Sequence, residues 1–252
     1  METAPRTPAT PRYRRGQESR ERILAAALDA FGHKGLEAAS TRDIAGAAQV
    51  NLPAIQYYFG NKEGLYLACA EHIVSTYAGA TLAAGEAAKR TLTEDPSPET
   101  CRAELAKLLT TLARFLVSAD DTRSWSLFVQ RELAKPGPAF DILFERLWSP
   151  GVELVAYLLA GVRGKSRPGA ETRLEAIQMI SGITTFASGR AAIERFLPPG
   201  TAIADQLCQQ RRARIAGCDP EHVRVAAQAV RGALGPVCKT HFYSLAACAA
   251  GR

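Results

Sequence analysis

The segment from Leu52 to Phe59 carries side chains suited to reading the edges of DNA base pairs. A glutamine such as Gln56 can make two hydrogen bonds with adenine in the major groove. Apolar and aromatic carbons can contact the methyl group of thymine. The residues expected to face the bases are Pro53, Ala54, Gln56 and Tyr57.

Four neighbouring side chains have the chemistry to hold the DNA backbone. Tyr58 can donate its phenolic hydrogen to a phosphate, and Lys62 places a cation beside the N–H groups that begin the next helix. Thr41 and Arg42 start the preceding short helix and are expected to contact the other strand. Such contacts fix the position of a protein on DNA without reading its sequence.

These side chains need a set of helices to position them. The apolar pattern predicts an amphipathic helix over residues 17–33, with Gly35 as its left-handed C-terminal cap. Ser40 is then expected to cap a short helix over residues 41–48.

A second short helix is predicted from Leu52 to about Phe59, with Asn51 as its N-cap and Pro53 in its first turn. Ile55 lies four residues before Phe59, so both anchor one face in the core. This arrangement is the helix-turn-helix, whose second helix enters the major groove. Two ordinary packing helices are the alternative, but caps, apolar positions and exposed polar positions all favour the helix-turn-helix.

The remaining chain is predicted to be all-α as well, because alternating β-branched runs are nearly absent. Residues 91–100 are expected to form a loop. Helices are predicted over residues 100–118, 122–134, 138–147, 150–163, 170–196, 203–216 and 219–234. The expected domains are a flexible basic arm (1–16), a helix-turn-helix domain (17–63), a larger helical-bundle domain for ligand binding and dimerisation (64–234), and a tail of unknown structure (235–252).

The chain has 252 residues and a formal net charge of +6, and its first residues are rich in arginine and proline. Interleaved prolines at positions 5, 8 and 11 are expected to keep this arm from folding. Two interpretations stay open: a solvated tail without function, or an arm that neutralises phosphates or enters the minor groove.

Residues 170–196 are apolar on almost every side, which predicts packing on the chain's own core and on a second subunit. A central helix of a monomeric bundle is the alternative. A ligand pocket between helices is expected to use aromatic side chains and one cation: Trp125, Phe128, Phe144, Trp148, Phe186 and Arg190. Phe140 and Tyr157 are further aromatic candidates, although plain core packing explains such residues equally well.

No pattern typical of an enzyme, a cofactor site or a metal site stands out. Cys238 and His241 have ligand-like spacing, with Cys248 as a third donor, yet a free tail explains them better. The six cysteines are widely spaced and are expected to be reduced thiols in a cytoplasmic protein, with a redox-sensing pair as the alternative. No apolar run reaches the ~18–20 residues that span a membrane.

Three motifs, Thr41–Ala45, Val50–Phe59 and Asn61–Leu65, together resemble the DNA-binding domain of the TetR/AcrR family. One departure is Gln56, which replaces the first aromatic of that family's frequent Tyr-Tyr pair. Residues from Phe128 to about Phe196 resemble the CecR-type subgroup of the same family.

The resemblance implies a homodimer that binds double-stranded DNA at a palindromic operator and loses DNA affinity when a small-molecule effector binds. The sequence therefore predicts a dimeric, ligand-responsive repressor. Activation in place of repression uses the same groove contacts and stays open. The alternative class is a helical small-molecule-binding protein or enzyme with a vestigial helix-turn-helix.

Overall fold

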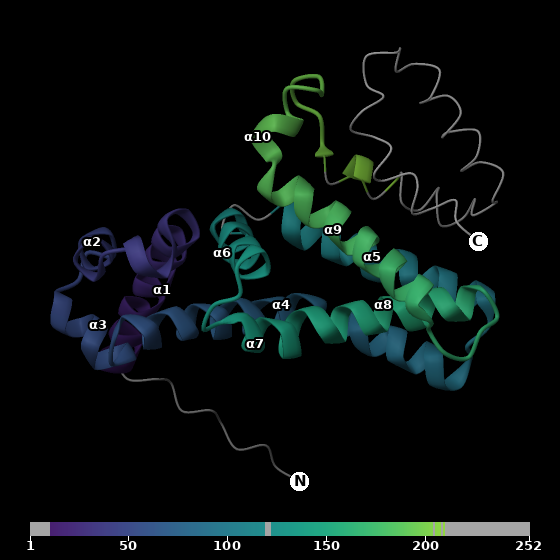
Figure 1. Cartoon of the computed structure of the whole chain (residues 1–252), viewed down its shortest axis with the longest axis horizontal. Helices are drawn as coiled ribbons and strands as arrows, with labels where there is room; N and C mark the ends of the chain where they lie inside the picture. The colour runs from purple at the N-terminus through teal and green to yellow at the C-terminus, as the bar shows by residue number, and fades with distance from the viewer. Residues whose placement is uncertain (1–10, 119–121, 204, 208, 210–252) are drawn as a thin grey trace, which may run out of the picture. The chain divides into compact units, whose positions relative to one another are not determined.

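The computed structural model describes residues 11–118, 122–203, 205–207 and 209. Within these ranges all of the regular secondary structure is helical, which confirms the all-α prediction. Helices α1 (Pro11–Ala38), α2 (Thr41–Ala47) and α3 (Leu52–Phe59) lie together beside the start of α4 (Lys62–Glu94) (Figure 1).

Side-chain caps fix the starts of three successive helices. Ser40 accepts a hydrogen bond from the Asp43 N–H at 3.4 Å, and Asn51 accepts one from the Ala54 N–H at 3.1 Å. Asn61 accepts from the Gly64 N–H at 2.7 Å. Each cap satisfies an N–H group that has no partner inside its own helix. The predicted positions of α2, α3 and the start of α4 are confirmed.

The first helix begins at Pro11 and not at Gln17, so the expectation that residues 11–16 belong to an unfolded arm is wrong. Proline fits the first turn of a helix because the N–H that it lacks would have no partner there. Prolines 5 and 8, with the rest of residues 1–10, lie outside the described residues. The helix expected to end before Gly35 is interrupted there, because Gly35 has a non-helical conformation with a φ of 81° and a ψ of 173°, and α1 continues beyond this kink to Ala38.

The predicted loop over residues 91–100 is largely wrong, because α4 continues to Glu94 and α5 (Pro98–Ser118) begins soon after. The Thr93 hydroxyl donates to the Lys89 carbonyl oxygen at 3.0 Å, so its polar group is satisfied within the helix. Proline and serine in this stretch therefore mark a short junction between α4 and α5, over residues 95–97.

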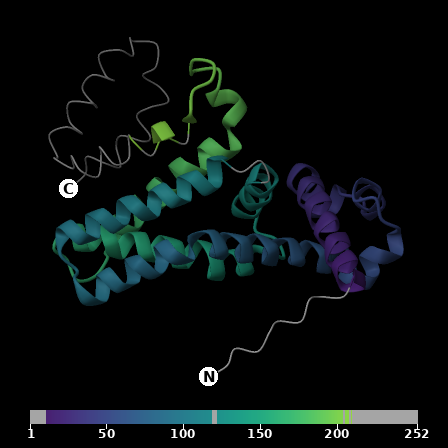
Figure 2. The same cartoon turned by 180° about the vertical axis from the view of Figure 1, so that it is seen from behind.

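Four helices and a π-helical turn follow in the described part of the chain: α6 (Thr122–Ala134), α7 (Phe140–Leu143), η1 (Phe144–Trp148), α8 (Ser149–Val162) and α9 (Ala170–Ser188), and then the short α10 (Arg190–Ile193) (Figure 2). The predicted break at Pro150 is absent, since Pro150 occupies the first turn of α8 directly after η1. The single helix expected over 170–196 instead ends at Ser188, with Gly189 as its C-cap. Residues 203, 205–207 and 209 are helical, and residues 219–234 lie outside the described residues.

One hydrophobic core joins the helix-turn-helix to the helices that follow it. Its buried members include Phe31 of α1, Ile44 of α2 and Ile55 of α3. Tyr66 of α4 and Phe128 of α6 belong to the same cluster, with ring centroids 4.6 Å apart. Helices α1 and α3 therefore pack on α4, and α1 also packs on α6.

A buried polar contact crosses this core. Glu132 of α6 is only 2% exposed, and its carboxylate accepts a hydrogen bond from the Tyr66 hydroxyl at 2.6 Å. The second carboxylate oxygen accepts from the Gly137 N–H at 3.0 Å. Burial and this bond to Glu132 raise the pKa of Tyr66, so the hydroxyl stays protonated and donates.

Replacing Tyr66 with phenylalanine should destabilise the fold, because a buried carboxylate oxygen loses its donor. The expected loss is about 1–3 kcal/mol in the free energy of unfolding, measured by urea denaturation. Tyr157→Phe is the matched control, since Tyr157 is exposed and its hydroxyl lies outside this contact. Equal stability of the two variants would contradict the assignment.

Candidate DNA interface and ligand cavity

Helix α3 has one buried face and one exposed face. Ile55 points into the core, and Phe59 packs against the same cluster. On the other side Pro53, Gln56 and Tyr57 are exposed, and Tyr57 is 83% accessible. These three side chains are free to meet base edges, as their chemistry requires.

The other two aromatic and apolar candidates on α3 are less accessible. Ala54 is half-buried against the core cluster, and so is Tyr58. The Tyr58 ring lies 5.0 Å from that of Tyr57, and its hydroxyl reaches toward Gly16, where an added Cβ would be 3.4 Å away. Tyr58 therefore links α3 to the start of α1 in addition to its predicted contact with phosphate.

The predicted phosphate-binding lysine has a structural partner. The Lys62 ammonium donates to the Glu37 carbonyl oxygen at 2.9 Å, so it caps the short part of α1 that follows the kink at Gly35. An ammonium has further N–H groups that can meet a phosphate. Thr41 and Arg42 occupy the first turn of α2, with the Arg42 side chain exposed.

The backbone conformation of Gln49 and the exposure of Leu52 were not predicted from the sequence. Gln49, in the turn between α2 and α3, has a left-handed φ of 54°, a conformation usually taken by glycine. Leu52 begins α3 with an exposed side chain next to the predicted base-reading residues. From the sequence alone, a leucine in the first turn of a helix could equally be a core residue or a residue that contacts DNA.

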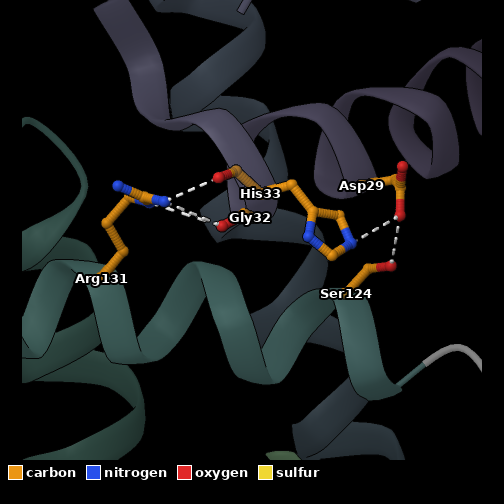
Figure 3. A network of polar contacts seen from close by, with 5 residues as sticks. All are labelled: Asp29, Gly32, His33, Ser124 and Arg131. Atoms are coloured by element: carbon orange, nitrogen blue, oxygen red, sulfur yellow. Dashed lines mark hydrogen bonds and ion pairs between the residues drawn. The ribbon is translucent and has the colours of Figure 1, made fainter. Parts of the chain in front are cut away.

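Helix α6 holds the end of α1 through backbone carbonyls (Figure 3). The Arg131 guanidinium donates to the His33 carbonyl oxygen at 2.9 Å and to the Gly32 carbonyl oxygen at 3.2 Å. Carbonyl groups in the last turn of a helix lack partners of their own, so this arginine satisfies them. Gly35, just beyond them, would bring an added Cβ to 3.2 Å from Arg131.

Helices α1 and α6 also approach each other closely at Gly32 of α1 and Ser124 of α6. An added Cβ on Gly32 would lie 2.9 Å from the Ser124 carbonyl oxygen, so a larger residue has no room. The Ser124 hydroxyl donates to the Asp29 carboxylate at 3.3 Å, and His33 lies 3.5 Å from the same carboxylate (Figure 3). α1 and α6 are therefore tied by packing and by polar contacts.

A cavity of about 620 Å³ lies among α4, α5, α6, η1, α8 and α9. Trp125, Phe144 and Trp148 line it as predicted, together with Phe140. Its volume and its aromatic lining fall in the range typical of small-molecule sites.

Three of the six residues first predicted for the pocket lie elsewhere, and the further candidate Tyr157 does not line the cavity either. Phe128 is completely buried in the core against Tyr66, and Phe186 packs on the small cluster of Val117, Ile203 and Leu207. Arg190 pairs with Glu194 at 2.8 Å on α10. None of the three is among the residues that line this cavity.

The charged groups among the residues that line this cavity are Arg173 and Glu153. The guanidinium Nε and Nη2 donate to the two carboxylate oxygens at 2.6 and 3.1 Å. These hydrogen bonds hold the pKa of Glu153 below its usual range. Neither this pair nor the cavity-lining aromatics Tyr77 and Phe115 was predicted from the sequence.

Helix α9 leaves apolar side chains uncovered within the described chain. Leu174 is 62% exposed and Ile177 is 45% exposed, whereas Ala176 and Ile183 are buried. A helix with apolar residues on both faces is typical of one that packs on a second body.

Both cysteines in the described residues are buried free thiols, Cys69 and Cys101. Burial raises the pKa of each thiol, which lowers its reactivity. Cys208, Cys218, Cys238, Cys248 and His241 lie outside the described residues. No helix in the described part of the chain is both long and apolar enough to cross a membrane.

Residues 23–69 match the bacterial regulatory proteins of the tetR family, and residues 101–218 match the C-terminal domain of the HTH-type transcriptional dual regulator CecR. CecR of Shigella flexneri is 34% identical over 182 residues, which make up 71% of this chain and 80% of CecR.

Two solved structures share the fold at low sequence identity. One is AibR in complex with isovaleryl coenzyme A and operator DNA, with a TM-score of 0.57, 15% identity, and coverage of 77% of this chain and 96% of AibR. The other is FadR from Bacillus subtilis in complex with stearoyl-CoA, with a TM-score of 0.53, 16% identity, and coverage of 78% of this chain and 97% of FadR. Taken with the helix-turn-helix geometry, these matches show that the chain belongs to the TetR family of DNA-binding transcription regulators and has a CecR-like C-terminal domain.

Proposed function

We propose that the protein is a dimeric repressor, and not an enzyme, that leaves a palindromic operator when a small molecule fills the cavity. The observation that carries this proposal is the position of α6. Trp125 and Val129 of α6 line the cavity, while Ser124 and Arg131 of the same helix hold α1. A ligand that shifts α6 thus acts on the DNA-binding helices.

Relatives support the proposed ligand control. AibR carries an acyl-coenzyme A and operator DNA in one crystal structure, and FadR carries stearoyl-CoA. An aromatic cavity in the same fold gives this chain a site for an apolar effector. Such a regulator would act in the cytoplasm, where bacterial DNA lies.

The proposed contacts to DNA come from both helices of the motif. Pro53, Gln56 and Tyr57 would read bases, with Ala54 at the edge of that surface. Tyr58 and Lys62 would hold phosphates, and so would Thr41 and Arg42 across the groove. The stretch from Pro11 to Gly16 includes three arginines, which are further candidates for phosphate contacts.

Replacing Gln56 with alanine should relax sequence preference without unfolding the protein, because the side chain is exposed. The expected loss is about 1–3 kcal/mol of discrimination between the selected operator and unrelated DNA. Fluorescence anisotropy with both DNAs at one salt concentration measures it.

The exposed Gln206 offers a matched control, because it lies outside the helix-turn-helix. Gln206→Ala should leave both affinities as they are. Unchanged discrimination in Gln56→Ala would show that this side chain does not read the operator.

Dimerisation is proposed to use the exposed apolar face of α9. A helix-turn-helix reads two half-sites roughly one helical turn of DNA apart, which requires two copies of the motif. Leu174 and Ile177 would pack against the same residues of the second copy in a two-fold arrangement.

Leu174→Glu should convert the dimer to a monomer, because a buried unpaired charge is strongly unfavourable. Sedimentation at micromolar concentration measures the change. Leu82→Glu on α4 is the control, since both leucines are 62% exposed. An interface centred on α9 would be contradicted if Leu174→Glu remained a dimer. It would also be contradicted if Leu82→Glu lost the dimer to the same extent.

A further inference from the structure

Six aromatic side chains line the cavity of about 620 Å³, and three of them form one group on α7 and η1. The rings of Phe140 and Phe144 are stacked, with centroids 5.8 Å apart and planes inclined by 15°. The Trp148 ring joins them, with its centroid 5.6 Å from that of Phe140. Phe144 is 48% exposed, so a molecule from solvent can reach this group.

The other three aromatic side chains form a second group, which comes from α4, α5 and α6. The Phe115 ring lies 6.1 Å from that of Tyr77 and 5.9 Å from that of Trp125. Among the described residues, no ring contact joins the second group to the first. A molecule inside the cavity therefore meets aromatic rings that come from two separate groups.

An aromatic lining of this kind favours a flat aromatic molecule over a saturated molecule of the same size. Both molecules bury apolar area, but aromatic pairs also attract each other in stacked and edge-to-face arrangements. A rigid ring system loses little conformational freedom on binding, whereas a flexible chain loses much more. The lining thus indicates a ligand with planar, fused rings.

The charged side chains that line the cavity are already paired with each other. Besides its two bonds to Glu153, the Arg173 guanidinium donates from Nη1 to the Pro168 carbonyl oxygen at 3.2 Å. An anionic ligand would approach the Glu153 carboxylate, and a cationic ligand would approach the Arg173 guanidinium. Either ligand would also lose hydration without gaining an unpaired counter-charge. The pair therefore favours a ligand without net charge.

We propose that the cavity binds an uncharged, planar molecule with fused aromatic rings. Its rings pack on the two aromatic groups, and an uncharged polar substituent lies beside Arg173 and Glu153 without separating them. This inference rests on the proposed ligand-controlled function and names the class of its effector. That class differs from the isovaleryl coenzyme A and stearoyl-CoA that AibR and FadR carry, since those molecules are aliphatic and anionic.

A planar aromatic cation is the strongest competing ligand class. The face of an aromatic ring attracts a cation, and more so when the cation has lost its water. The Glu153 carboxylate would have to leave Arg173 to neutralise such a ligand, because these two side chains are the charged ones that line the cavity. A fatty acid anion fits less well still, since it has no ring and it approaches Glu153.

Isothermal titration calorimetry with four probes of one carbon skeleton separates shape from charge. They are 2-naphthamide, its saturated analogue decahydro-2-naphthamide, the anion 2-naphthoate and the cation 2-naphthamidine. The native full-length protein should bind 2-naphthamide about two- to tenfold more tightly than the saturated amide, the effect of ring contacts. It should bind each charged probe about three- to tenfold more weakly than 2-naphthamide.

Replacing Phe144 with leucine tests the ring contacts, because leucine keeps the site apolar but removes a ring. Phe144→Leu should reduce the preference for 2-naphthamide over its saturated analogue. Phe196→Leu is the matched control, since Phe196 is 86% exposed and lines neither cavity of the described chain. It should keep the preference of the native protein.

Replacing Arg173 with glutamine tests the role of charge. This variant leaves Glu153 without its cation, so Arg173→Gln should bind 2-naphthamidine about three- to tenfold more tightly than the native protein does. Arg163→Gln is the control, because Arg163 also pairs with a glutamate, Glu175, but does not line the cavity. Its affinity for 2-naphthamidine should be that of the native protein.

Several results would overturn the inference. They are equal binding of the two amides by the native protein, binding of either charged probe as tight as that of 2-naphthamide, equal effects of a variant and its control, or no binding of any probe. Operator affinity, measured in the same samples with and without 2-naphthamide, tests the proposed function separately. Binding of 2-naphthamide with no change in operator affinity would support the inference and contradict the proposed ligand control. Operator binding without probe also shows that each variant is folded.

Discussion

Helix α6 is the element on which the remaining structure depends, because it contacts the DNA-binding domain on one side and the cavity on the other. Arg131 caps the carbonyl groups at the end of α1, and Gly32 allows the two helices to touch. Val129 and Leu133, on the opposite face of α6, line the cavity. One helix thus connects the cavity to the motif.

The core beneath α6 strengthens this connection. Tyr66, Phe128 and Glu132 join α4 to α6 in the same cluster that buries Ile44 and Ile55. Close-packed interiors do not deform continuously, so the proposed response to a ligand requires a second discrete arrangement of these helices. The π-helical turn η1 contributes Phe144 and Trp148 to the cavity, and such turns are often found at functional sites.

Local signals predicted the DNA-binding motif well. Ser40, Asn51 and Asn61 cap the helices that their chemistry indicates, because each cap bonds a backbone group only a few residues away. Proline was the weak signal, since Pro11 and Pro98 begin helices in stretches that were expected to be unfolded or a loop. Proline is accepted in the first turn of a helix, where the N–H that it lacks would have no partner, but it breaks a helix farther in. The cavity depends on long-range packing, so composition could not separate Trp125, which lines it, from the core residue Phe128. Arg173 and not Arg190 lines the cavity, although each arginine pairs with a glutamate, so the sequence could not tell them apart.

The most direct test of the coupling is the affinity for the operator selected from genomic fragments, measured with and without the cavity ligand. Arg131→Gln removes the guanidinium that holds α1, and Arg195→Gln is a control on an exposed arginine. The native chain and Arg195→Gln should lose DNA affinity about five- to 150-fold when the ligand binds. Arg131→Gln should bind the ligand normally but lose much less DNA affinity. An equal loss in all three proteins would contradict the role of α6.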